Sequence, residues 1–186
     1  METERVRGNP SGITNAHAAQ NIRAARQAIG MDLRTMSTNL TDAGRKISPS
    51  GISKIENGDR RVDVDDLTGI AYILRTTPAA LLTPPDNGTT LAGVPEHFLP
   101  EEIQAWLAGR VKLTDDDLIR YWKEEAFNSA SYVRRSEEIL AQYDQGHVGV
   151  TPREVYEKRV AAHCERLGMI RGRQLALDPM AVTIED

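Results

Sequence analysis

The stretch that decides the fold is "ISPSGISKIENGDRR", residues 47 to 61. Ser48 is a favourable N-cap, and Pro49 suits the first helical position, where its missing N–H removes no hydrogen bond. Ile52 and Ile55 fall on one helical face, and the glycine of "ENG" suits the left-handed conformation that ends many helices. The stretch therefore predicts a short helix that buries two isoleucines and presents small or polar side chains on its other face.

Four more short helices are predicted around this one, because apolar residues recur three or four positions apart between start and stop signals. Their apolar positions are Ala18, Ile22, Ala25 and Ile29 before Gly30; Leu33, Met36 and Leu40; Leu67, Ile70, Ala71 and Leu74 after the N-cap Asp63; and Leu81 and Leu82 after Thr77 and Pro78. Five short helices within residues 16–83 predict a compact bundle.

Breaks in periodicity divide the rest of the chain. Residues 1–15 are polar and interrupted by Gly and Pro, which predicts a flexible N-terminal arm. Two prolines and an Asn-Gly pair predict a linker over residues 84–93. Residues 94–178 are expected to form a helical C-terminal domain, followed by a tail at residues 179–186.

The predicted C-terminal domain has three helical segments and no convincing alternating strand pattern. The first begins at Pro100 and ends near Gly109; the last has Thr151 as N-cap and Glu154 in a capping box. Between them lies a long seam of Ile119, Trp122, Ala126, Ser129, Val133, Ser136, Leu140 and Tyr143. This seam favours either packing within its own domain or a homodimer through the C-terminal helices. Trp106 and Trp122 are expected in the core, the alternative for either being an interface anchor. The whole chain is predicted to be all-α.

Composition and charge limit the classes of function. A single cysteine excludes a disulfide framework, and no long apolar run indicates a membrane segment or signal peptide, so a cytoplasmic location is expected. The net charge of −4 argues against a simple polycation. Residues 16–61 nevertheless carry eight Lys and Arg against four Asp and Glu, so a basic segment is joined to a more acidic remainder.

The helix order and the sequence "GISKIENGDRR" resemble the Xre family, the Cro/CI-type or lambda-repressor-like helix-turn-helix of phage repressors and bacterial regulators. The resemblance runs from about Ala19 to Leu82. The family's recognition helix commonly reads Ile-Ser-x-Ile-Glu-x-Gly, and the matching residues are Ile52, Ser53, Ile55, Glu56 and Gly58. The resemblance implies a five-helix DNA-binding domain, and general likeness points more narrowly to a phage immunity repressor. It also implies a structural ion pair between Arg26 and Glu56.

A DNA-binding role also follows from the residue types. A helix enters the major groove when its first outward turn carries small or polar side chains. These are Ser48, Ser50, Gly51, Ser53 and Lys54. Arg45 and Lys46 before the helix, and Arg60 and Arg61 after it, are expected at phosphates. For the last two, the other interpretation is an ordinary solvated basic pair.

Two features differ from the family pattern. The connection before Ser48, "TDAGRKI", is about five residues longer than the usual tight turn, which puts the register of residues 41–47 in doubt. The helix also lacks the Gln, Arg or Asn side chains that usually make bidentate base contacts. Lys54 is its one long polar side chain available to read bases, so specificity would depend on Lys54, the serines and DNA shape.

No enzyme is expected, with no catalytic residue, metal or cofactor. A Walker-type loop, a Gly-x-Ser-x-Gly elbow, a dinucleotide fingerprint and a His-Glu-x-x-His zinc motif are missing from the sequence. His163 and Cys164 are neighbours on a helix and point in different directions, so they do not share a metal site. The acidic run from Asp115 to Asp117 is explained by the first turn of a helix.

The sequence thus predicts a sequence-specific regulator of transcription, most simply a repressor, that binds double-stranded DNA and no membrane. The competing interpretation is a protein-interaction module, an antitoxin or adaptor, whose helix-turn-helix is vestigial.

Overall fold

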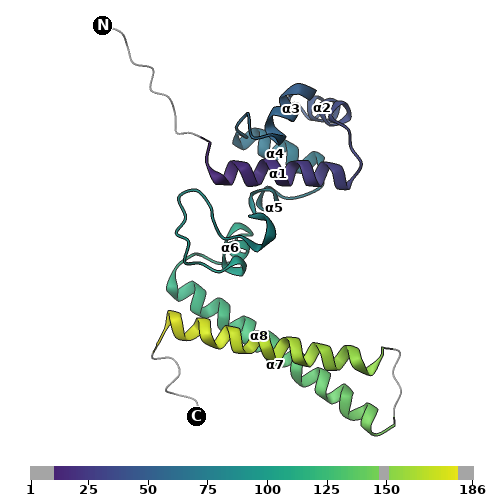
Figure 1. The fold of residues 1–186 in the computed structure, drawn as a ribbon, viewed down its shortest axis with the longest axis vertical. Coiled ribbons are helices and arrows are strands. Elements are labelled where there is room, and N and C mark those ends of the chain that lie inside the picture. The colour runs from purple at the N-terminus through teal and green to yellow at the C-terminus, as the bar shows by residue number, and fades with distance from the viewer. Residues whose placement is uncertain (1–10, 147–150, 180–186) are drawn as a thin grey trace. The chain divides into compact units, whose positions relative to one another are not determined.

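The computed structural model describes residues 11–146 and 151–179. Within these ranges the chain has eight α-helices, one short 3-10 helix and no strand, so the all-α prediction is confirmed for the described residues (Figure 1). Contacts between α-carbons divide the chain after Arg110 into two units. Most of the predicted arm, residues 1–10, lies outside the described residues, as does nearly all of the predicted tail.

The N-terminal unit contains six α-helices among its described residues. They are α1 (Ile13–Ala28), α2 (Leu33–Asp42), α3 (Pro49–Glu56), α4 (Val64–Ile73), α5 (Pro78–Leu82) and α6 (Pro100–Leu107), with the 3-10 helix η1 (Pro85–Asn87) between α5 and α6. The predicted start signals are present, because Ser48, Asp63 and Thr77 each accept a hydrogen bond from a backbone N–H of the helix that follows. Asp32, which was not predicted, caps α2 in the same way.

The core of the N-terminal unit is aliphatic and joins the first five helices. Its fully or almost fully buried members are Ile22, Met36, Leu40, Ile47, Ile52, Ile55, Ile70, Ala71, Leu74 and Leu81. Ile29 differs from the prediction, because α1 ends at Ala28 and the Ile29 side chain is 48% exposed. Burial of the two isoleucines of α3 fixes which face of that helix points outward.

The connection between α2 and α3 is ordered by a glycine turn and two hydrogen bonds. Gly44 takes a φ of 85°, which only glycine adopts without strain, and the N–H of Arg45 bonds the carbonyl of Leu40 at 2.8 Å. The hydroxyl of Ser37 donates to the carbonyl of Ile47 at 2.6 Å. The longer connection therefore begins with a glycine helix end and returns the chain to α2 immediately before α3.

Helix α1 extends beyond residue 16, the first residue of the predicted DNA-binding domain. Helix α1 begins at Ile13, and Asn15 accepts a hydrogen bond from the N–H of Val62 at 2.9 Å, so residues 13–15 belong to the fold rather than to an arm.

The predicted linker at residues 84–93 also packs on the N-terminal unit. Thr14 accepts from the N–H of Ala92 at 2.8 Å, and Leu91 is buried. The division between the units comes later, after Arg110, and α6 falls on its N-terminal side.

The second unit contains two long helices, α7 (Asp115–Asp144) and α8 (Arg153–Leu177), which run antiparallel and pack along their length (Figure 1). Trp122, Ser129 and Ser136 of the predicted seam are buried. The seam is therefore used for packing within the chain. An ion pair between Glu125 and Arg166, 2.7 Å apart, joins the two helices.

Three details of the C-terminal half differ from the predictions. Trp106 is 36% exposed, whereas Trp122 is buried as expected. Helix α8 begins at Arg153 after Pro152, without a side-chain cap, so the predicted capping box with Thr151 and Glu154 is not formed. Among the described residues, no helix has the length and apolar character needed to cross a membrane.

Candidate nucleic-acid interface

Helix α3 presents the small polar face that the sequence predicted. Three of the residues on this face are exposed, namely Ser48, Ser50 and Lys54, whereas Gly51 and Ser53 are half-buried. The hydroxyl of Ser48 accepts from the N–H of Gly51 at 3.1 Å and lies 3.1 Å from the hydroxyl of Ser50. Ser48 therefore caps the helix, and Ser50 and Lys54 are its most accessible polar side chains.

Gly51 has a packing role. A Cβ added there would lie 3.1 Å from Cγ2 of Ile47 and 3.2 Å from the Ser48 hydroxyl. The first distance is tighter than ordinary van der Waals contact, so the absence of a side chain lets Ile47 pack against the first turn of α3. The glycine at position 51 is thus explained by packing, whether or not its backbone also approaches DNA.

Arg45 and Arg60 have a different immediate role from the predicted phosphate contact. Asp66 is fully buried at the start of α4, and its two carboxylate oxygens accept from Nε of Arg45 and Nη2 of Arg60, both at 2.6 Å. Nη2 of Arg45 also donates to Asp63 at 2.7 and 2.9 Å. The hydrogen bond to Asp66 is the main reason that the pKa of Arg45 is raised. These arginines tie both segments that flank α3 to the first turn of α4.

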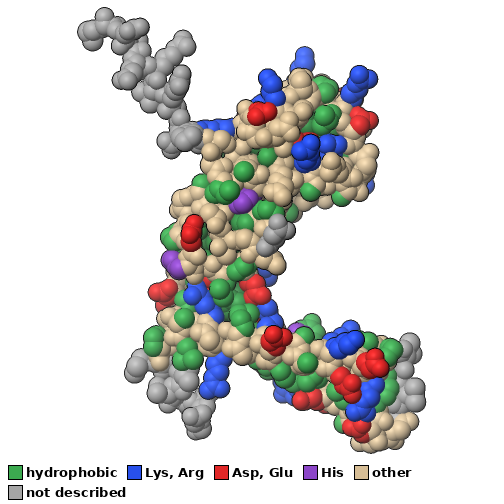
Figure 2. All heavy atoms as spheres, in the orientation of Figure 1, with side chains coloured by type: hydrophobic (Ala, Val, Ile, Leu, Met, Phe, Trp, Pro, Cys, Tyr) green, Lys and Arg blue, Asp and Glu red, His purple; other side chains and the backbone are tan. Residues whose placement is uncertain are grey.

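Lys46, Lys54 and Arg61 are the remaining predicted cations, and all three are exposed. Within the described part of the chain, none of them has a carboxylate within ion-pair distance. Figure 2 shows Lys and Arg side chains projecting from the end of this unit where α2 and α3 lie in Figure 1. Their charge is therefore available to an outside anion, unlike that of Arg45 and Arg60.

The Arg26–Glu56 ion pair implied by the resemblance is present. Nε and Nη2 of Arg26 donate to the two oxygens of Glu56 at 2.6 and 2.9 Å, and the side chains are 13% and 3% exposed. Nη1 of Arg26 also donates to the carbonyl of Met31 at 2.7 Å. The hydrogen bond to Glu56 is the largest cause of the raised pKa of Arg26. This two-pronged contact holds the end of α3 against α1.

Sequence reasoning missed several side chains that shape this surface. Asn57 is the exposed C-cap of α3, three residues after Lys54, so the two share a helix face. Its carboxamide is a type that pairs with adenine, and the i, i+3 spacing from Lys54 was the available signal. No role was predicted for Asp66, because nothing in the sequence pairs it with two distant arginines.

No protein-family model, curated protein or solved structure matches the chain. Among the described residues, no group of three or more His, Cys, Asp or Glu side chains is placed to hold a metal ion.

Proposed function

We propose that the chain is a sequence-specific DNA-binding regulator of transcription of the Xre type, acting as a repressor. The supporting observation is α3 itself: a short capped helix with one face locked into the core and a polar face flanked by cations without carboxylate partners. We include in the proposal that it acts in the cytoplasm of a bacterial or phage-infected bacterial cell, the phage immunity repressor being one such case. No catalytic activity, metal or cofactor is part of the proposal.

In the proposed mechanism α3 enters the major groove of double-stranded DNA. Lys54 and Asn57 reach base edges, the first suited to guanine and the second to adenine. Ser50 lies on the first turn, where groove-reading helices commonly make contacts. Lys46 and Arg61 contact phosphates on either side, which sets the position of the helix but does not read the sequence.

One such module buries too little surface for tight binding, so two copies on adjacent half-sites are proposed. A homodimer through the C-terminal helices would use faces of α7 and α8 that lie outside their mutual contact. Phe127 of α7 is an exposed aromatic side chain on such a face.

The second candidate function is a protein-interaction module, an antitoxin or adaptor, with a vestigial helix-turn-helix. The observation that favours it is the neutralisation of Arg45 and Arg60 by Asp63 and Asp66, which removes two of the four predicted phosphate-contacting side chains. Under this alternative the exposed cations beside α3 would have no effect on biological activity.

The two functions are separated by comparing Lys54→Ala and Arg61→Ala with Arg23→Ala, which removes an exposed cation of α1. If Lys54 reads a base, its loss relaxes sequence preference and weakens specific binding by about 1–3 kcal/mol. Arg61→Ala should weaken all sequences alike and reduce the slope of log K against log salt by about one phosphate contact. Binding that is the same for all three variants would contradict the proposal and favour the protein-interaction module.

A further inference from the structure

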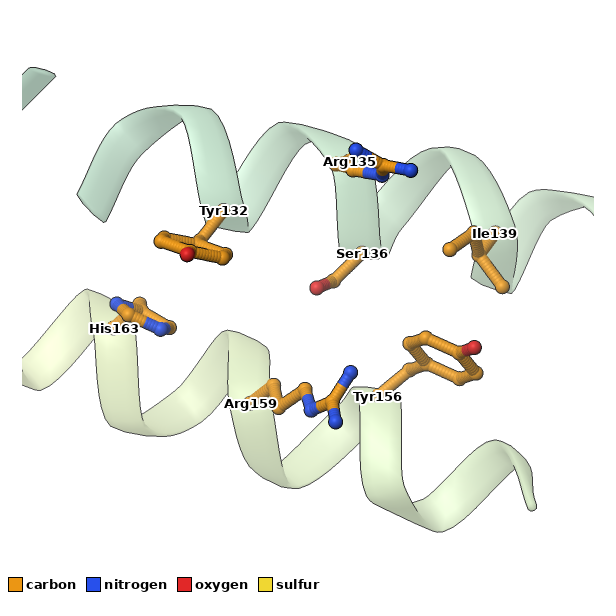
Figure 3. Close-up of a pocket in the computed structure, with 7 residues that line it drawn as sticks. All are labelled: Tyr132, Arg135, Ser136, Ile139, Tyr156, Arg159 and His163. Carbon is orange, nitrogen blue, oxygen red and sulfur yellow. The ribbon is translucent and has the colours of Figure 1, made fainter. Parts of the chain in front are cut away.

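A cleft between α7 and α8 gathers side chains that the proposed DNA contact does not use. Its lining residues are Tyr132, Arg135, Ser136, Ile139, Tyr156, Arg159 and His163, and its volume is about 520 Å³ (Figure 3). This volume lies within the range of about 300–1,000 Å³ that is typical of small-molecule sites. Both helices belong to the same unit, so the cleft is formed by the chain itself.

The cleft contains two arginines without carboxylate partners among the described residues, Arg135 on α7 and Arg159 on α8. Three other arginines of this unit are paired: Arg120 binds Asp117, Arg153 binds Asp144 and Glu157, and Arg166 binds Glu125. Arg134 and Arg171, which are exposed, also have no carboxylate partner among the described residues, but they do not line the cleft. Carboxylates are therefore abundant around this hairpin but do not neutralise the two arginines of the cleft. The two arginines line the same cleft from facing helices, and both are exposed, so their side chains are free to turn toward a phosphate, which accepts paired hydrogen bonds from arginine.

Aromatic rings make up most of the rest of the wall, beside Ser136 and Ile139. The Tyr132 ring stacks on His163, with centroids 4.9 Å apart and planes inclined by 11°. The guanidinium carbon of Arg159 lies 5.6 Å from the centre of the Tyr156 ring. Tyr132 is 59% exposed, so one large ring is accessible to a ligand. Nδ1 of His163 is buried and has no hydrogen-bond partner among the described residues.

We propose that the cleft between α7 and α8 binds a small phosphate ester that carries a flat aromatic group, with Arg135 and Arg159 on the phosphate and Tyr132 and Tyr156 against the ring. We expect neither the phosphate nor the aromatic group alone to bind as tightly as the complete ligand. Inorganic phosphate leaves the rings unused, and an uncharged aromatic compound leaves the two guanidinium groups unpaired. The site is independent of α3, so this inference does not rest on DNA binding.

The test is a titration of the full chain, followed by NMR, with three probes: phenyl phosphate, inorganic phosphate and phenol. Phenyl phosphate is expected to bind with a Kd of about 1 mM or tighter, and at least about tenfold more tightly than either of the other two. The double variant Arg135→Gln/Arg159→Gln should weaken phenyl phosphate by at least about tenfold, because it removes charge-assisted hydrogen bonds to the dianion. The double variant Arg134→Gln/Arg171→Gln removes two exposed arginines outside the cleft and should leave the affinity unchanged.

Tyr156→Leu removes a ring and keeps an apolar side chain, so it should weaken phenyl phosphate while leaving inorganic phosphate as it was. Far-UV circular dichroism of each variant establishes that the helical hairpin is intact. No saturable binding of phenyl phosphate at millimolar concentration would overturn the proposal. Equal loss of affinity in both arginine double variants would overturn it as well, because general charge rather than the cleft would then account for binding.

Discussion

Replacing Glu56 by Gln tests how α3 is held in place. The variant keeps the size of the side chain and removes its charge. In the unaltered chain Nη2 of Arg26 lies 2.9 Å from a carboxylate oxygen of Glu56. In the variant, Nη2 would either meet the NH₂ group of the glutamine amide, which cannot accept, or share the one remaining amide oxygen with Nε. One of the two charge-assisted hydrogen bonds is therefore lost, and a guanidinium group that is only 13% exposed loses its counter-ion.

The structure sets the size of the effect. Removing one partner of a buried ion pair costs about 3–5 kcal/mol. Arg26 keeps its hydrogen bond to the carbonyl of Met31 and a little exposure, so the lower end of that range, about 3 kcal/mol, is expected. The double variant Arg26→Met/Glu56→Leu removes both charges and should be much less destabilised, because no buried charge is left unpaired.

Hydrogen–deuterium exchange of the full chain is the assay, because it reports the N-terminal unit separately from α7 and α8. Amides of α1 and α3 should lose protection in Glu56→Gln, whereas those of α8 should not change. A loss of stability of the N-terminal unit below about 1 kcal/mol, which is the effect of an average substitution, would refute the reasoning. So would a double variant as unstable as the single one.

Three other perturbations follow from the same contacts. Gly51→Ala places a Cβ 3.1 Å from Cγ2 of Ile47, and this close contact should cancel the gain of about 1 kcal/mol that alanine otherwise gives a helix over glycine. Urea denaturation should therefore show no gain in stability of the N-terminal unit, and a gain of the full amount would show that Ile47 moves aside freely. Asp66→Asn should cost about 2 kcal/mol and weaken DNA binding through the position of Arg45 and Arg60, whereas unchanged stability would show that the two arginines do not need this carboxylate. The pKa values of Asp32 and Asp63 are lowered, mainly by backbone hydrogen bonds from Thr35 and Asp66 respectively. Their contribution to stability is therefore present above the ordinary carboxyl pKa of about 4 and is lost as pH falls through the lower pKa values of the folded state. Asp32→Asn should make the urea midpoint less sensitive to acid in that range, and an acid profile identical to that of the unaltered chain would contradict this.

The regular part of the N-terminal unit could be predicted from the sequence because its signals are local. Caps such as Ser48 and Asp63, and apolar spacing such as that of Ile52 and Ile55, act within one or two turns of a helix. The helix starts and the inward face of α3 follow from them.

The remaining features depend on contacts between distant residues. Arg45 and Arg60 are of the residue type that contacts phosphates, and only the folded chain brings both of them to the buried carboxylate of Asp66. Similarly, the prolines and Asn-Gly pair of residues 84–93 have linker composition, yet backbone atoms at Thr90 and Ala92 find partners on α1. Turn residues indicate where regular helices stop and do not show whether the segment packs.

The most direct test of sequence-specific DNA binding is a selection from randomised duplex DNA with the full chain at two salt concentrations, alongside the triple variant Lys46→Ala/Lys54→Ala/Arg61→Ala. An enriched motif is expected for the unaltered chain and none for the triple variant, with two inverted half-sites about one helical turn apart if two copies bind. Weak, salt-sensitive binding without an enriched motif, equal in both proteins, would contradict the proposed role of α3.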